Sequence, residues 1–178
     1  MACVPASKLF RTAWALAAAC AIGACGFHLR ENATLPAGMQ HVHVAVNGNY
    51  ALQQRLVRAL QTSGATVEDA GGPGIAELSV PVAAFSTETL SAGGYARVSE
   101  FAVHYQVRFR VSDTAGGTLV PEKRIDMSRE YSYDATNTVG NASQVQAIEA
   151  SLNDDMVQAI LFRLEAAARN AQALPAGS

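Results

Sequence analysis

Hydrophobic and polar residues alternate with changing period along this chain, and the first clear pattern is a period of two between residues 39 and 46. Histidines and valines take turns there, which is typical of a strand with one buried side. The side chains expected to face the core are those of Val42, Val44 and Val46. Those expected on the other side are His41, His43 and Ala45.

Two segments carry a helical period instead. Leucines recur every fourth residue at Leu52, Leu56 and Leu60, which predicts an amphipathic helix over residues 50–62. Asn47-Gly48-Asn49 offers a turn and an N-cap before it. Further on, Ser143 with Gln146 forms a capping-box signature. A second, longer helix is predicted from there to about Asn170. Its apolar positions are Val145, Ile148, Leu152, Met156, Ile160 and Leu164.

Three further strands are predicted between these helices. In the first, Leu78, Val80, Val82 and Ala84 are expected on one face, and Pro81 indicates an edge strand or a bulge. The next strand, residues 98–111, has the strongest alternation. Its apolar face is Phe101, Val103, Tyr105, Val107, Phe109 and Val111. The last strand covers residues 119–133, and at least one of Tyr131 and Tyr133 is expected to pack in the core.

This order of elements predicts an α+β fold of the type β-α-β-β-β-α. One-sided strands need a cover, and two one-sided helices supply it. We therefore expect a two-layer sandwich with a four-stranded mixed or antiparallel sheet and both helices on one face. The single domain is predicted to span residues 39–170, followed by a flexible tail at residues 171–178.

The N-terminal segment is predicted to be an export signal. Lys8 and Arg11 precede a short apolar run that is too short to span a bilayer. The run ends in Ile22-Gly23-Ala24-Cys25, which resembles a bacterial lipobox. Residues 1–24 are then a cleaved lipoprotein signal peptide, and residues 25–38 form a tether lipidated at Cys25. Two acyl chains anchor a protein firmly, whereas one anchors it only marginally.

Cysteine content and charge narrow the function further. Cys3 and Cys20 lie in the predicted signal, which leaves Cys25 without an intramolecular disulfide partner. The net charge is −2, so nothing indicates a nucleic-acid-binding protein. One basic region nevertheless stands out as a candidate anion site, because arginine can donate two hydrogen bonds to a phosphate. It consists of Arg97, Arg108, Arg110, Lys123, Arg124 and Arg129.

Catalytic motifs are scarce in the sequence. His41, His43 and His104 are candidate metal ligands, and a membrane-tethered periplasmic hydrolase is therefore one alternative. A structural envelope lipoprotein without a specific ligand is another. No nucleophile elbow, phosphate-binding loop or Cys-x-x-Cys motif occurs.

The segment Cys25-Gly26-Phe27-His28-Leu29-Arg30 resembles the start of the LptE family of lipopolysaccharide-assembly lipoproteins. Leu35-Pro36 before the first strand, Arg129–Asp134 at the end of the last strand and Ile160–Leu164 in the long helix also fit the family pattern. The resemblance implies a non-enzymatic protein of the outer membrane. It implies no cofactor beyond the diacylglycerol and N-acyl chains on Cys25.

The same resemblance implies two partners. Members of the family plug the lumen of the β-barrel protein LptD, assist its assembly and bind lipopolysaccharide for insertion into the outer leaflet. The basic residues that bind lipopolysaccharide in the family do not transfer directly. Residues 135–144 contain no Lys or Arg, and near Gly93-Gly94 the closest base is Arg97. Our hypothesis is that the basic region named above contributes the lipopolysaccharide site.

Overall fold

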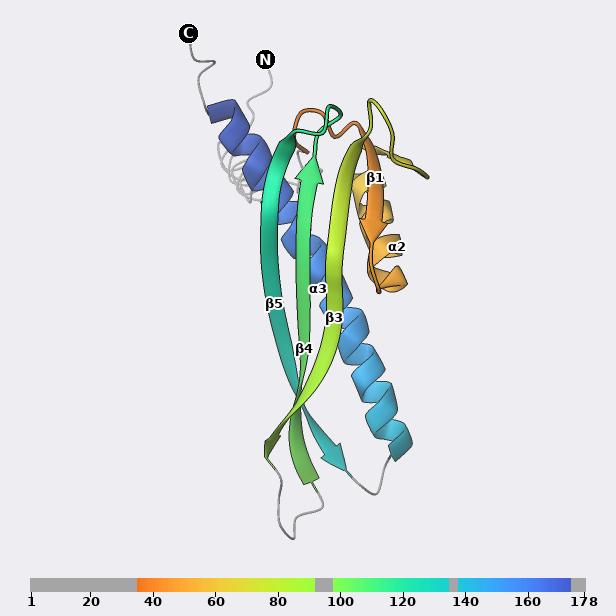
Figure 1. Cartoon of the computed structure of the whole chain (residues 1–178). Helices are drawn as coiled ribbons and strands as arrows, with labels where there is room; N and C mark the ends of the chain where they lie inside the picture. Colours follow the sequence, from red (N-terminus) through yellow and green to blue (C-terminus); the bar gives the residue numbers. More distant parts are fainter. Residues whose placement is uncertain (1–34, 92–97, 135–137, 174–178) are drawn as a thin grey trace, which may run out of the picture. The chain divides into compact units, whose positions relative to one another are not determined.

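The chain after residue 34 forms a sheet with two helices laid on it, as a computed structural model shows for residues 35–91, 98–134 and 138–173 (Figure 1). The described residues all belong to the unit Asn32–Ser178. In order, its elements are β1 (His41–Val46), α2 (Tyr50–Thr62), β2 (Thr66–Glu68), β3 (Ala76–Ser91), β4 (Val98–Ser112), β5 (Thr118–Asp134) and α3 (Thr138–Ala173).

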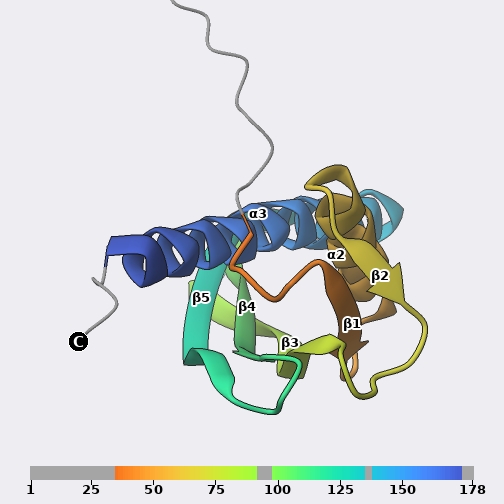
Figure 2. The same ribbon diagram turned by 90° about the horizontal axis from the view of Figure 1, so that it is seen from above.

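The sheet has five strands in the order β2-β1-β3-β4-β5. β1 pairs in parallel with both β2 and β3, and β3, β4 and β5 form an antiparallel meander. Both described helices lie on the same face of the sheet, and no helix of the described residues covers the other face (Figure 2). The predicted two-layer α+β fold is confirmed. The number of strands is corrected from four to five, because β2 was not predicted.

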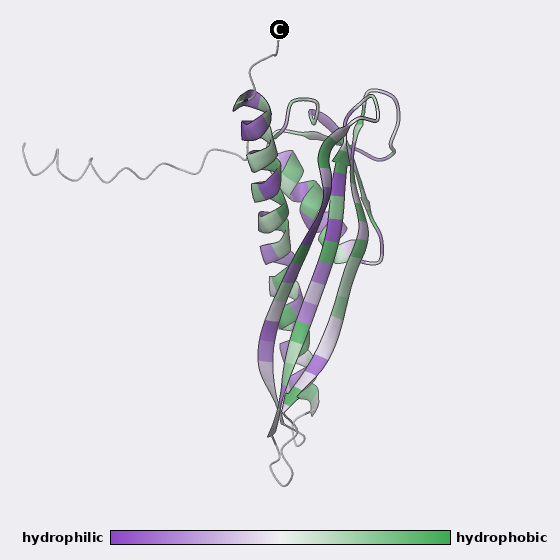
Figure 3. Cartoon of the chain, turned by 60° about the vertical axis from the view of Figure 1, so that its left-hand side comes forward, coloured by the Kyte–Doolittle hydropathy of each residue, from purple (hydrophilic) through white to green (hydrophobic). Residues whose placement is uncertain are grey.

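The core lies between the helices and the sheet. In α2, Leu52, Leu56 and Leu60 are completely buried, as the fourfold spacing predicted. In α3, the completely buried side chains are Met156, Ile160 and Leu164. Burying each such side chain contributes roughly 1.5–3 kcal/mol. They meet the inward side of β1, β3 and β4, which is apolar. Along the strands, apolar residues of this side alternate with polar residues of the other side, as the green and purple bands of Figure 3 show.

Pro81 sits in a β-bulge of an interior strand. β3 has β1 on one side and β4 on the other, and its register with β4 shifts between Ser79 and Val82. One extra residue reverses the facing of every later side chain. The prediction that Val82 and Ala84 share the inner face with Val80 is therefore wrong. Ala83 and Phe85 take those positions instead, since Ala83 is buried and Phe85 packs against the core.

The long helix begins earlier and ends later than predicted. α3 starts at Thr138, and Ser143 lies inside it, with its hydroxyl donating to the Val139 carbonyl at 3.1 Å. A side chain bonded back to residue i−4 is a mid-helix feature, so Ser143 is not the N-cap. The helix also continues to Ala173, into the segment predicted as a tail. The predicted signal peptide and Cys25 lie outside the described residues.

The lower half of the sheet in Figure 1 contains three strands only. β1 pairs with β3 no further than Val46 opposite Val80, and α2 packs against β1 and β2. Beyond that point β3, β4 and β5 continue together, and α3 packs on β4 and β5. We call this three-stranded part, which includes residues 82–91 of β3, the distal arm. We call the helix-free side of the whole sheet the open face.

Candidate ligand and partner surfaces

Three of the predicted basic residues meet on the open face. Even-numbered residues of β4 pair with even-numbered residues of β5 over the middle of the two strands, so that Arg108 lies directly opposite Arg124. Arg110 follows Arg108 by two positions on the same strand and therefore has the same facing. Paired side chains on neighbouring strands are about 5 Å apart at Cβ. We call Arg108, Arg110 and Arg124 the arginine band.

The arginine band is partly neutralised by neighbouring carboxylates. Arg108 approaches Glu122 at 3.5 Å from Nη1 to Oε1. Arg124 donates from Nε to both carboxylate oxygens of Asp126, at 2.9 and 2.8 Å, and this hydrogen bond raises the pKa of Arg124. Arg110 is exposed and has no ion-pair partner among the described residues. It is therefore the most available cation of the band for an incoming anion.

Lys123 and Arg129 do not join this band. Lys123 pairs with Phe109 and Arg129 pairs with Val103, and both partners face the helices. Arg129 donates to Ser151 Oγ and to Asp155 Oδ2 of α3, each at 2.8 Å. The predicted basic region is therefore divided between the two faces. Arg97, its sixth member, lies outside the described residues.

The open face of the distal arm is acidic. Glu88 on β3, Ala102 on β4 and Glu130 on β5 lie in one row across the sheet, and Glu100 lies in the next. His104 is the base beside them, and its Nε2 is 2.9 Å from Glu88 Oε2. Between these acids and the Arg108–Arg124 pair, the described residues that face the open side include no Lys or Arg, since Arg129 faces the helices. An anion approaching the open face would therefore be attracted at the arginine band and repelled over the arm.

The three candidate metal-binding histidines are not brought together. His41 contacts Glu68 at 2.8 Å, and His43 Nδ1 is 3.1 Å from the Glu68 carbonyl. Along β3, His43 pairs with Glu77, whereas His104 pairs with Ser86. At the rise of a strand, these positions are roughly 30 Å apart. No group of three metal-binding side chains is found in the described part of the chain.

A buried polar cluster connects α2, β4 and α3, and sequence reasoning predicted only one part of it. Asn49 caps α2 as expected, since its Oδ1 accepts from the Leu52 amide at 2.9 Å. Its Nδ2 donates to Tyr105 and to Asn153, each at 3.0 Å. Burial raises the pKa of the Tyr105 hydroxyl. Asn153 is a buried polar residue next to Leu152 of the apolar stripe of α3. Its place beside that stripe was the sequence signal that could have identified it as part of the cluster.

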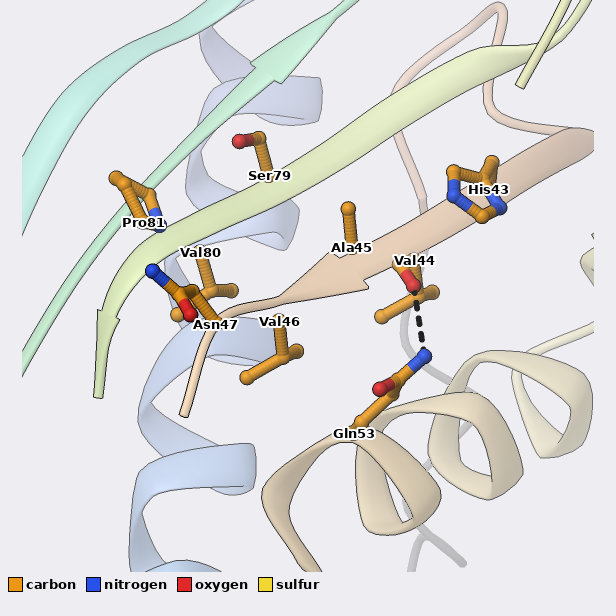
Figure 4. Close-up of a pocket in the computed structure, with 9 residues that line it drawn as sticks. All are labelled: His43, Val44, Ala45, Val46, Asn47, Gln53, Ser79, Val80 and Pro81. Atoms are coloured by element: carbon orange, nitrogen blue, oxygen red, sulfur yellow. Dashed lines mark hydrogen bonds between the residues drawn. The ribbon is translucent and has the colours of Figure 1, made fainter. Parts of the chain in front are cut away.

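An open depression of about 360 Å³ lies where β1 ends beside the bulge of β3. Figure 4 shows Gln53 reaching from α2 toward β1, where its Nε2 donates to the Val44 carbonyl at 3.2 Å (Figure 4). His43 is the titratable residue of the lining, which otherwise consists of apolar and neutral polar side chains. This lining contains no carboxylate, and Figure 4 shows its histidine, His43, pointing away from its one hydroxyl side chain, Ser79.

The fold and these surfaces define a class of protein: a two-layer α+β domain with a broad polar sheet face and no metal-binding group of three side chains among the described residues. The family model LptE, described as lipopolysaccharide-assembly, matches residues 39–164. The chain belongs to this family of lipopolysaccharide-assembly lipoproteins, which are not enzymes. The search of curated proteins returns no significant match. No helix in the described part of the chain is long and apolar enough to cross a membrane.

Three solved lipoprotein structures have a similar fold. Lipoprotein B from Nitrosomonas europaea has a TM-score of 0.65 and 23% identity, over 83% of this chain and 94% of that one. Rare lipoprotein B from Shewanella oneidensis has a TM-score of 0.63 and 17% identity, over 74% and 98%. A minor lipoprotein from Acinetobacter baumannii has a TM-score of 0.60 and 17% identity, over 72% and 92%.

Proposed function

We propose that this protein is anchored to the outer membrane through acyl chains on Cys25 and works there as the plug and assembly partner of an LptD-type β-barrel. In this role it binds lipopolysaccharide while the barrel inserts that lipid into the outer leaflet. The family match over residues 39–164 carries the proposal. The domain lies on the periplasmic side of the membrane and within the barrel lumen.

The open face supports the placement in a lumen. The interior of a transmembrane barrel is polar. A sheet face with no described helix on it can lie against such a wall, and the carboxylates beside Arg108 and Arg124 already neutralise those two charges. The helix-covered face supplies the core, so docking through the open face leaves the fold intact.

The arginine band supports contact with the phosphates of lipopolysaccharide. Guanidinium groups form paired hydrogen bonds to phosphate. No carboxylate among the described residues pairs with Arg110, so no ion pair has to break before it binds an anion. Of the six residues in the hypothesis, Arg108, Arg110 and Arg124 share this face, and we propose these three as the contacts of a single ligand. Lys123 and Arg129 would have to act from the opposite side of the sheet.

Copurification tests the partnership. The tagged full-length protein is purified from native outer membranes in mild detergent, and the eluate is identified by mass spectrometry. We expect a large β-barrel protein in a one-to-one ratio. Recovery of the lipoprotein alone would contradict the plug role and favour a structural envelope lipoprotein. Cys25→Ser provides the anchoring control, because this variant should lose its acyl mass and its membrane association.

Lipopolysaccharide binding is tested with the variant Arg108→Gln/Arg110→Gln. Each hydrogen bond from a charged group is worth about 1.5–3 kcal/mol, so affinity should fall by about tenfold or more. Lys123→Gln is the matched control, because it removes one exposed charge from the other face of the same hairpin. Equal affinity of the double variant and the wild type would show that the arginine band is not the site.

A further inference from the structure

Over the distal arm, one backbone edge of β3 has no strand beside it among the described residues. β1 accompanies β3 only from Ala76 to Val80, and no described strand pairs with residues 82–91 on that side. Figure 1 shows β1 and α2 running beside the upper part of β3 only. The turn at Gly48 closes the upper end of this edge, since a Cβ at Gly48 would lie 4.0 Å from the Ala83 carbonyl oxygen.

Four residues direct their backbone groups outward along this edge. The Ala83 carbonyl faces Gly48, on the side away from β4. Backbone groups alternate between the two sides of a strand, so Phe85, Thr87 and Thr89 share the direction of Ala83. By the same alternation, the intervening residues, among them Ser86 and Glu88, direct their backbone groups toward β4, with which they pair. The outward amides and carbonyls extend over roughly 20 Å, which is enough for a strand of six or seven residues.

Between its two register shifts, over residues 82–89, the edge of β3 lacks most of the features that normally prevent strand addition. Edge strands are usually protected by proline, by lysine or by inward-facing charges. β5, the other long edge, has Pro121, and both Lys123 and Arg129 face inward on it. Residues 82–91 of β3 contain no Pro, Lys or Arg, and Glu88 is their single charge. From Ser86 onward every side chain of β3 is exposed, including Leu90 at 45%.

We propose that the β3 edge of the distal arm accepts one extended segment of the barrel partner, which adds to the sheet as a strand in line with β1. This inference rests on the proposed function, because it names the surface through which the plug and the barrel join. Main-chain hydrogen bonds from Phe85, Thr87 and Thr89 supply affinity in this mode of recognition. Basic residues of the added strand face Glu88 on the open face.

Charge distinguishes a barrel segment from a second copy of this chain. Two copies paired edge to edge through β3 would place their open faces side by side. Each would bring Glu88, Glu100 and Glu130 to the joint surface, and no described Lys or Arg faces the same side beside them, since Arg129 faces the helices. Like charges brought close together disfavour association. A segment with basic residues carries the opposite charge, so the same acidic residues attract it.

The test uses Thr87→Pro in the tagged full-length chain, with Thr87→Val as the matched control. Proline removes the outward amide of residue 87 and is tolerated at an edge whose amides face solvent. Valine keeps the amide and removes only the hydroxyl group. Both variants are purified from native outer membranes, and the copurifying barrel protein is quantified. We expect Thr87→Pro to recover at least about tenfold less barrel than Thr87→Val, in line with a lost strand contact.

Each outcome of this comparison has a distinct meaning. If the wild type recovers no barrel, the proposed function fails. If the wild type and Thr87→Pro recover equal amounts of barrel, the proposed function stands and the strand-addition proposal is overturned. Concentration-dependent dimers of the purified chain that Thr87→Pro abolishes would also overturn it, because the edge would then belong to a second copy.

Hydrogen exchange on the wild-type protein gives a second test that does not depend on the folding of a variant. In the free protein the amides of Phe85, Thr87 and Thr89 should exchange faster than those of Ser86 and Glu88, which bond to β4. In the copurified complex the first three should become protected. Fast exchange of those amides in the complex would overturn the proposal.

Discussion

The hydroxyl group of Tyr105 donates a hydrogen bond of 2.9 Å to Oδ1 of Asn153, 48 residues further along the chain. This contact joins the middle of β4 to the middle of α3. Because Asn49 Nδ2 also donates to both groups, the N-terminus of α2 is tied to the same point. Three elements that carry the core thus share one polar cluster, and buried clusters of this kind are costly to leave incomplete.

Removing the Tyr105 hydroxyl group tests how much this cluster contributes to the stability of the fold. Tyr105→Phe keeps the ring and its stack on Phe85, whose centroid is 3.9 Å away. The variant loses one donor to Asn153 and one acceptor for Asn49. We expect the free energy of unfolding to fall by about 1–2 kcal/mol in urea denaturation. Tyr50→Phe, at a side chain that is 73% exposed, should stay within about 0.5 kcal/mol of the wild type.

The stability of the protein should also depend on Tyr105 at alkaline pH. Burial raises the pKa of this hydroxyl in the folded state above the unfolded value of about 10. Its contribution is therefore complete below pH 10 and is lost as the pH rises from there toward the folded pKa. Between about pH 9 and 11, the free energy of unfolding measured by urea denaturation should fall more steeply for the wild type than for Tyr105→Phe. Parallel curves would contradict this assignment.

Three neighbouring residues of α3 offer a comparison of buried and exposed polar contacts. Asp154 pairs with Arg55 and Asp155 with Arg129, and their carboxylates are 67% and 51% exposed. Asp154→Asn and Asp155→Asn should each cost less than about 1 kcal/mol, and less still in high salt. Asn153, which is 4% exposed, should cost about 1–3 kcal/mol on substitution by alanine. Equal costs at the three positions would refute this ranking.

Leucines in the core and on the arm should differ sharply. Leu60 is completely buried between α2 and the sheet, so Leu60→Ala should lower the free energy of unfolding by about 2–5 kcal/mol. Leu90 on the distal arm is 45% exposed, and Leu90→Ala should cost about 0.5 kcal/mol or less. Thermal or chemical unfolding of the two variants measures both values. A large loss of stability in Leu90→Ala would mean that Leu90 is packed against another part of the chain when no partner is bound.

The periodicity of the sequence was sufficient to predict the long helices and strands, but not the short or irregular ones. β2 has three residues, Thr66–Glu68, which is too few for an alternation to be recognised. At Pro81 the bulge was one of two stated possibilities, but the sequence gives no sign of the reversed facing that follows it. The first turn of α3, before Ser143, contains Gly140 and Asn141, which have low helix propensity, and one large apolar residue, Val139, which does not form a stripe.

The basic region was predicted from residues that are close in the sequence. In the structure its described residues are divided between the two faces of the sheet. Lys123 and Arg124 are neighbours in the chain and lie on opposite faces of the sheet. The free edge of β3 could not be predicted at all, because it depends on where β1 stops. One core expectation held: Tyr131 packs against the core and stacks on Phe101 at a centroid distance of 5.6 Å.

The cluster of Asn49, Tyr105 and Asn153 has a kinetic consequence. Its members are separated by 56 and 48 residues, so it can close only after α2, the β3–β5 meander and α3 have met. Contacts that form after the folding transition state affect the unfolding rate rather than the folding rate. We therefore expect Tyr105→Phe to unfold faster while refolding at nearly the wild-type rate in stopped-flow measurements. Proportionally slower refolding would place the cluster in the folding nucleus instead.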